Sequence, residues 1–215
     1  GINIQCCRYW WVGQWKHKRL SYPFWRLYYN FNEGARVFYK KQVALSPERL
    51  LLIPPFTPFS TDLVSDGEND DYGLEGGWIK SDKMEQEALQ KGYVLHLFIH
   101  FNLGYPHDTL QPGIYKVDAS EEDKALFGMI AGKLKTGSAS FSMADTLMLH
   151  QLITSSMVRI PEVLWNTKTP EERVQQAIHY MNRNIDKSIT NETLADVVGM
   201  AVNSFGRLFK EQTGL

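Results

Sequence analysis

The last quarter of the chain constrains the fold most, because it contains two short amphipathic segments joined at a glycine. Thr190 gives the first segment a polar start, and its side-chain oxygen can cap free helix amides. Gly199 ends this segment, since glycine adopts positive φ without steric cost in a short turn between helices. The apolar residues between them, at helical spacing, are Leu194, Val197 and Val198.

A second helix is predicted directly after this turn. Ala195 is small enough to let the two helices cross closely, and Met200 can fill the angle between them. The predicted helix has an apolar face of Phe205, Leu208 and Phe209 and polar positions at Asn203, Ser204, Arg207 and Lys210. This is the geometry of a helix-turn-helix, whose second helix can enter the major groove of DNA.

The segment LADVVGMAVNSFGRLFKEQTG resembles the first helix-turn-helix of the AraC/XylS family of bacterial transcription regulators. The resemblance covers roughly residues 171–215, with Ala195, Gly199, Phe205, Leu208, Phe209, Thr213 and Gly214 at the spacings of the family. It implies DNA binding through Val202–Lys210, where Asn203, Gly206 and Arg207 match base-facing positions. The predicted DNA-binding residues are Asn203, Ser204, Gly206, Arg207 and Lys210.

Two residues depart from the family pattern. Ala201 stands where the family usually has a serine that caps the recognition helix, which costs that helix roughly 1 kcal/mol. Gly206 offers no side chain to a base and costs a further ~1 kcal/mol of helix propensity. Base reading is therefore expected to depend mainly on Arg207, whose guanidinium can pair with guanine O6 and N7.

The charge of this region favours a different function. Residues 171–215 carry six acidic and five basic side chains, whereas DNA-binding modules usually carry a basic patch for the phosphates. A helical module that binds proteins is therefore a rival interpretation. The resemblance also implies a linker helix and a second helix-turn-helix after Leu215, so these residues are expected to be half of the family's DNA-binding domain, cut short by truncation or disorder.

The whole chain has the composition of packed globular domains. It has 215 residues, of which 43% are hydrophobic and 13% aromatic, and a net charge of −1. A basic stretch over residues 8–41 and an acidic stretch over residues 62–87 are interpreted as solvated faces. Cys6 and Cys7 form no disulfide framework, and no apolar run is long enough for a membrane span, so a cytoplasmic protein without a membrane partner is predicted.

Short strands are predicted from about Tyr9 to Phe101. The segments 24–30, 37–45, 50–53 and 94–101 have the aromatic or alternating pattern of strands, and prolines end the third. In the last of them Leu95, Leu97, Ile99 and Phe101 share one face, and His96, Phe98 and His100 share the other. A small barrel or sandwich is predicted, with the segment from Asp62 to Trp78 as a surface loop.

The segments WRLYYNFNEGARVF and VALSPERLLLIPPFTPF are similar to the cupin-like sensor domain of the same family. This similarity implies a barrel that binds a small effector, for example a sugar. A metal-dependent cupin enzyme is the alternative, but the His-x-His pair that holds the metal is missing. Arg26 and Phe59 stand where the carboxylate and the later histidine of such a metal site are expected, so neither a metal site nor a cofactor is predicted.

The predicted effector-binding residues are Arg26, Tyr28, Tyr39, His96 and His100. His96 and His100 are about 13 Å apart along a strand, at ~3.3 Å per residue, too far to share one metal. Both can equally be core histidines with local partners, and Trp25, Tyr28 and Tyr39 can equally be core aromatics. Arg26 is more informative, because a buried arginine needs an anionic partner in the protein or on the effector.

Two helices are predicted in the middle of the chain, one from Ser120 to about Gly137 and one from about Ser142 to Met157. They are expected to cover the barrel, and part of this layer is expected to form a homodimer contact. Residues 159–169 are predicted to be a linker, and Thr169 and Pro170 are predicted to start the next helix.

The predicted fold class is α+β: a cupin-like sensor and dimerisation domain at 1–158, the linker at 159–169 and an all-α helix-turn-helix domain at 170–215. The predicted function is a ligand-responsive transcription regulator without catalytic residues, whose partners are double-stranded promoter DNA, a small-molecule effector and a second copy of the chain. The rivals are the metal-dependent enzyme and the protein-interaction module.

Overall fold

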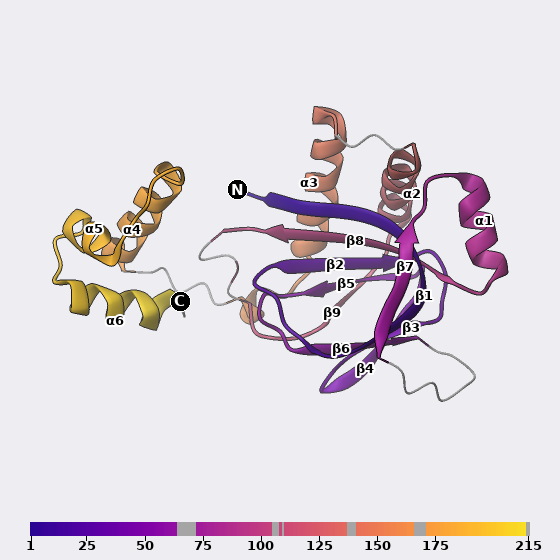
Figure 1. Cartoon of the computed structure of the whole chain (residues 1–215), viewed down its shortest axis with the longest axis horizontal. Helices are drawn as coiled ribbons and strands as arrows, with labels where there is room; N and C mark the ends of the chain where they lie inside the picture. The colour runs from indigo at the N-terminus through magenta and orange to yellow at the C-terminus, as the bar shows by residue number, and fades with distance from the viewer. Residues whose placement is uncertain (64–71, 105–107, 109, 137–140, 166–170, 214–215) are drawn as a thin grey trace. The chain divides into compact units, whose positions relative to one another are not determined.

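The computed structural model describes residues 1–63, 72–104, 108, 110–136, 141–165 and 171–213. The chain divides into two compact units, one formed by Gly1–Gly104 with Asp108–Trp165 and one that contains Asn166–Leu215. The first unit combines a curled antiparallel sheet with helices, and the described part of the second is helical (Figure 1). The mixed α and β class predicted from the sequence is confirmed. No described helix is long and apolar enough to cross a membrane.

The sheet is organised around its first strand. The order is β4-β3-β6-β1-β8-β2-β5-β9, and β7 also pairs with β1. β1 is 18 residues long and pairs with β8 in its first part and with β7 and β6 in its second. Its register shifts at three places, and such irregularities bend a strand, so β1 curls the sheet. The strands are β1 (Asn3–Leu20), β2 (Trp25–Asn30), β3 (Ala35–Tyr39), β4 (Lys41–Leu45), β5 (Arg49–Ile53), β6 (Phe59–Leu63), β7 (Gly73–Trp78), β8 (Val94–Asn102) and β9 (Tyr115–Asp118).

The central strands are buried on both faces. Leu27 of β2 and Leu97 of β8 face the core that the sheet shares with the helices. Tyr28 of β2 and Leu51 of β5 belong to a second core inside the curl. The alternation predicted for residues 94–101 is confirmed, since Leu95, Leu97, Ile99 and Phe101 lie in the first core and His96, Phe98 and His100 line the inside of the curl.

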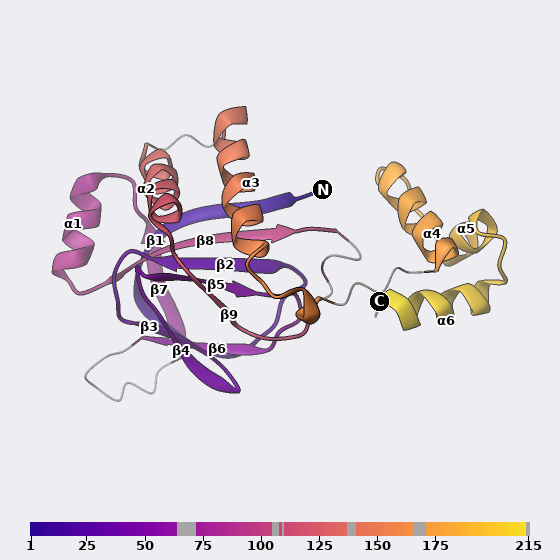
Figure 2. The same ribbon diagram turned by 180° about the vertical axis from the view of Figure 1, so that it is seen from behind.

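Three helices of the first unit begin at serine residues that cap their first turns. α1 (Asp82–Gln90) is capped by Ser81, and α2 (Glu121–Lys135) and α3 (Met143–Met157) begin at capping boxes. Both predicted middle helices are therefore confirmed. Phe127 of α2 stacks on Tyr29 of β2 with ring centroids 3.9 Å apart, which packs α2 against the sheet. α2 and α3 lie side by side on the same face of the sheet in both views (Figures 1 and 2).

Two predictions for the first unit were wrong. Residues 37–45 were predicted as one strand, but Lys40 has φ 57° and turns the chain, so that Tyr39 of β3 pairs with Lys41 of β4. Alternation alone does not distinguish a strand from a hairpin, and no glycine or asparagine marks this turn. The predicted loop ends earlier than expected, since Gly73–Trp78 is a strand paired with β1, and residues 64–71 lie outside the described residues.

The predicted linker is partly packed. Ile160 is buried, a short 3₁₀ helix η1 spans Glu162–Leu164, and Trp165 lies against Trp25 with ring centroids 5.9 Å apart. Linker residues 166–169 and the predicted helix start at Thr169 and Pro170 lie outside the described residues. The next helix begins later than predicted, at Glu172.

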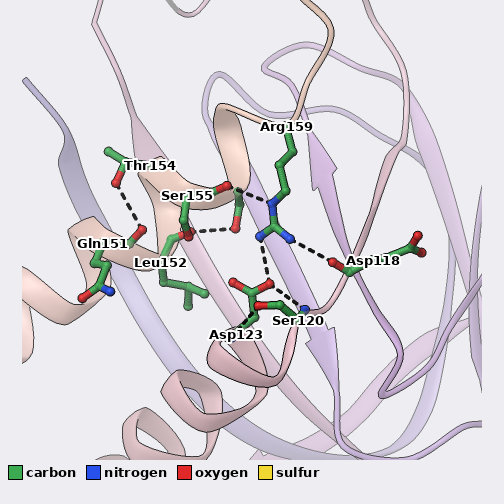
Figure 3. A network of polar contacts seen from close by, with 9 residues as sticks. Asp118, Ser120, Asp123, Gln151, Leu152, Thr154, Ser155 and Arg159 are labelled. Atoms are coloured by element: carbon green, nitrogen blue, oxygen red, sulfur yellow. Dashed lines mark hydrogen bonds and ion pairs between the residues drawn. The ribbon is translucent and has the colours of Figure 1, made fainter.

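Arg159 ties the end of α3 to the rest of the first unit (Figure 3). Its Nη2 lies 2.9 Å from Oδ2 of Asp123, whose side chain is 4% exposed in the first turn of α2. Its Nη1 donates to the carbonyl of Asp118, at the end of β9, and its Nε donates to the carbonyl of Ser155. A single guanidinium therefore joins α2, α3 and β9.

Arg159→Met is expected to lower the free energy of unfolding of the first unit by about 1–3 kcal/mol, because it removes the cation that compensates the buried Asp123 carboxylate. Urea unfolding of the full chain, followed by tryptophan fluorescence, measures this loss. Lys83→Met is the matched control, since its pair with Glu87 is exposed and contributes little. Equal stability of the two variants would contradict the assigned role of Arg159.

Candidate functional site

The inner face of the curled sheet lines a cavity of about 210 Å³. Its aliphatic lining is Val12, Leu20 and Leu74, and its aromatic lining is Trp10, Trp15, Tyr22, Tyr28 and Phe98. Its polar lining consists of His17, Arg26, His96 and His100. Among the described residues, no carboxylate or amide side chain lines the cavity. Four of the five predicted effector-binding residues are thus brought together, namely Arg26, Tyr28, His96 and His100.

The register of three neighbouring strands positions these side chains. His100 of β8 pairs with Cys6 of β1 on one side and with Arg26 of β2 on the other. His96 of β8 pairs in the same way with Asn30 of β2. Directly paired residues on antiparallel strands point to the same face of the sheet. Cys6, His100 and Arg26 therefore form one row of side chains across the three strands, and His96 belongs to another row.

Arg26 is the cation of this cavity and is only 8% exposed. One of its terminal nitrogens donates a hydrogen bond to the hydroxyl of Tyr28. Its guanidinium carbon lies 3.7 Å from the ring centroid of Tyr22, within cation–π distance. Its Nε is buried and has no acceptor, and no described carboxylate forms an ion pair with it.

The two histidines are neutral members of the cavity wall. Nδ1 of His96 lies 2.7 Å from Oδ1 of Asn30, and Nδ1 of His100 lies 3.1 Å from the Cys6 sulfur. Burial lowers the pKa of His96 to about 3, aided by His100 and Arg26. Burial and the positive charges of Arg26 and Arg8 lower the pKa of His100 to about 3. The positive charge of the cavity near neutral pH therefore resides on Arg26.

Tyr39, the fifth predicted effector-binding residue, lies elsewhere. It ends β3, beside the turn at Lys40, and does not line the cavity. Trp10, Trp15 and Tyr22 also line the cavity, although the sequence pattern did not predict them. Trp10 and Trp15 come from β1, whose irregular register hides the alternation. Within the described residues, no group of three or more histidine, cysteine, aspartate or glutamate side chains could hold a metal ion.

The second unit contains the predicted pair of helices. Its described helices are α4 (Glu172–Arg183), α5 (Asn191–Val197) and α6 (Val202–Thr213). Thr190 caps α5 by accepting from the backbone nitrogen of Thr193, and Gly199 has φ 65° in the turn, as its place in the sequence indicates. The core of the unit is formed by Ala177, Leu194, Ala195, Val198 and Phe205.

The other face of α6 is open. Phe205 is 1% exposed, whereas Asn203, Ser204, Arg207 and Lys210 are all exposed and Gly206 lies among them. Phe205 anchors the helix, so its polar side chains point away from the core of the unit. Four predicted DNA-binding side chains therefore share one accessible surface, which we call the α6 polar face and define as Asn203, Ser204, Arg207 and Lys210.

Gly206 weakens α6 without a packing reason. A Cβ added at this position meets no atom within 4 Å outside its own helix. Gly206→Ala is therefore expected to raise the stability of α6 by about 0.5–1 kcal/mol, because alanine has less backbone freedom to lose. Hydrogen exchange of the α6 amides in the full chain measures this gain. Faster exchange in the variant would contradict the open position assigned to Gly206.

Comparison with known proteins gives weak similarities. No family model and no curated protein matches the sequence. Among solved structures, an apo variant of ToxT from Vibrio cholerae strain SCE256 has a TM-score of 0.49 and 7% identity, covering 96% of this chain and 74% of that chain. ToxT of the same strain with bound unsaturated fatty acid has a TM-score of 0.42 and 9% identity, covering 98% and 92%.

A third similar structure is the AraC-like transcriptional activator CuxR, with a TM-score of 0.36 and 8% identity over 90% of this chain and 63% of that chain. Similarities of this size do not establish the function of this chain. Function is therefore inferred from the residues of this chain.

Proposed function

We propose that this protein is a ligand-responsive transcription regulator of the AraC/XylS type. The observation that carries the proposal is the pair α5 and α6. A glycine at positive φ joins the two helices, Ala195 and Phe205 are buried at their contact, and α6 presents a polar face that ends in arginine and lysine. A helix held in this way can place its exposed side chains on base edges in the major groove.

Within that function, α6 is the recognition helix. Arg207 can donate two hydrogen bonds to one guanine, Asn203 can pair with adenine, and Ser204 and Lys210 can contact bases or phosphates. Gly206 lets the backbone approach the DNA closely. The near-neutral balance of residues 171–215 is the feature that favours the rival protein-interaction module.

The first unit is the proposed cupin-like sensor. Its cavity offers Arg26, Tyr28, His96 and His100 to a small effector. An effector that binds one arrangement of sensor and linker more tightly shifts the population toward it and so changes DNA affinity. The sensor is assigned to residues 1–158, the linker to 159–169 and the DNA-binding region to 170–215. Ile160 is buried and Trp165 contacts Trp25, so this part of the linker packs against the first unit.

The protein is proposed to act as a homodimer in the cytoplasm. Met143 and Leu147 on α3 are 75% and 58% exposed, and Met129 on α2 is 50% exposed. Such apolar side chains on a helical layer fit a contact between two copies of the chain. Cys6 and Cys7 are unpaired, which is the state expected in a reducing compartment.

Selection of duplex DNA from a random pool by the full-length protein tests this function. The proposal expects an enriched sequence whose affinity exceeds that of a scrambled duplex by roughly a thousandfold or more and falls steeply with salt. If no sequence is enriched, or if the affinity for DNA does not depend on salt concentration, the protein-interaction module is favoured.

A further inference from the structure

Two residues of the cavity wall carry a buried side-chain donor without an acceptor among the described residues, Nε of Arg26 and Nε1 of Trp10. A buried donor without an acceptor costs about 1–3 kcal/mol, more when it is charged. Arg26 is the more telling of the two, because it is charged, is only 8% exposed and has no carboxylate partner among the described residues. Its charge is therefore left for a ligand to compensate.

The hydroxyl of Tyr28 adds a third donor. Its oxygen already accepts from Arg26, so its own hydrogen remains to be donated. Burial raises the pKa of Tyr28, which keeps this hydrogen in place. Arg26 and Tyr28 therefore form a pair of donors beside each other on β2, and one of them carries a positive charge.

The rest of the wall has the opposite character. Trp15, Phe98, Val12 and Leu20 offer apolar surface, and the described lining contains no carboxylate or amide that could accept from a hydroxyl-rich ligand. A cavity of about 210 Å³ is also smaller than the roughly 300–1,000 Å³ of pockets for drug-sized ligands. Its ligand is thus small, mostly apolar and rich in acceptors at one end.

We propose that the cavity binds a small monocarboxylate with an apolar body, and that its carboxylate is held by Arg26 and Tyr28. A guanidinium offers two parallel N–H groups to a carboxylate, so the charge of Arg26 is compensated by the ligand. The indole of Trp10 forms part of the wall around the ligand. This inference rests on the proposed regulator function, since it names the chemical class of the effector.

The structure favours this class over a sugar. Each sugar hydroxyl needs an acceptor as well as a donor when it is buried. The described wall offers such acceptors only as histidine ring nitrogens and phenol oxygens. A neutral sugar would also leave Arg26 as an uncompensated buried cation.

Titration of the full chain, without DNA, with octanoate, benzoate and phenylacetate tests the proposal. Fluorescence of Trp10 and Trp15 reports binding, and calorimetry confirms it. The matched probes are octanamide, benzamide and phenylacetamide, which keep the shape and lose the charge, with glucose and ribose as the sugars. At least one acid is expected to bind at least about tenfold more tightly than its amide.

Arg26→Met is expected to weaken binding of that acid roughly 10–100-fold, and Arg26→Lys less. Tyr28→Phe keeps the aromatic ring, removes only the hydroxyl and is expected to weaken binding severalfold. Arg49→Met is the control, because Arg49 is a partly buried arginine on β5 that does not line the cavity. Circular dichroism checks that each variant is folded. If Arg26→Met does not fold, the affinity of Arg26→Lys is the test.

Equal affinity for acid and amide, sugar binding in place of acid binding, or no binding of any acid would overturn the proposal. Undiminished acid binding by the folded Arg26 variants would overturn it as well. None of these results would contradict the proposed DNA binding. Conversely, acid binding that requires Arg26 but does not change DNA affinity would support the ligand class and contradict the ligand response of the regulator.

Discussion

Replacing Phe205 by alanine is expected to lower the stability of the helical unit by about 3–5 kcal/mol. Phe205 is 1% exposed and is the largest member of a core that otherwise contains Ala177, Leu194, Ala195 and Val198. Its ring also contacts that of Phe209, with centroids 5.3 Å apart. A core this small has few other contacts to compensate the loss, so the unit is expected to unfold in most molecules.

Hydrogen exchange of the α4, α5 and α6 amides in the full chain measures this effect. Val197→Ala is the control, because Val197 lies on α5 with 42% of its surface exposed. The Phe205 variant is expected to lose protection in all three helices while the sheet amides keep theirs. Similar protection in the two variants would show that Phe205 does not hold the helices together.

Acidification is expected to destabilise the first unit through His96 and His100. Their pKa values are about 3 in the folded chain, below the ordinary value of 6.5. Between about pH 6.5 and about pH 3 the unfolded chain binds protons that the folded chain does not bind. The free energy of unfolding is therefore fully retained above about pH 6.5, and within this range it falls by up to about 1.4 kcal/mol per pH unit for each histidine as the pH is lowered.

Urea unfolding at a series of pH values measures this slope. His96→Phe keeps a ring beside Trp15, Tyr28 and Phe98 but cannot bind a proton. The free energy of unfolding of this variant is therefore expected to fall less steeply with decreasing pH, because one of the two histidines no longer contributes. His150→Gln, a change on α3 outside the cavity, is the control. Identical slopes for wild type and His96→Phe would mean that His96 is protonated in the folded chain.

The parts of the fold that depend on local chemistry could be predicted from the sequence. Ser120 and Ser142 cap the two middle helices, Gly199 turns the chain at positive φ, and Phe205 is buried, because each outcome depends on residues a few positions away. The alternating faces of residues 94–101 could be predicted for the same reason.

The parts that depend on distant strands could not be predicted. Gly73–Trp78 becomes a strand only because β1 offers it an edge, and Lys40 takes up positive φ because Tyr39 and Lys41 pair across the turn. The packing of Ile160 and Trp165 also depends on residues far away in the sequence.

The candidate cavity shows the same division. His96, His100 and Arg26 belong to strands with clear alternation, so their common face could be predicted. Trp10 and Tyr22 could not be placed, because Trp10 lies on an irregular strand and Tyr22 just before β2. The absence of an acceptor for Nε of Arg26 among the described residues became visible only once its neighbours were placed.

Fluorescence anisotropy with the DNA duplex enriched by the full-length protein measures whether α6 reads DNA bases. Arg207→Ala is compared with Arg183→Ala, an exposed arginine at the end of α4 that lies off the α6 polar face. We expect Arg207→Ala to lose about 1–3 kcal/mol on the enriched duplex and much less on a scrambled one, and Arg183→Ala to change neither preference. If Arg207→Ala bound both duplexes as the wild type does, α6 would not be the recognition helix, and the helical unit would be a module for protein contacts.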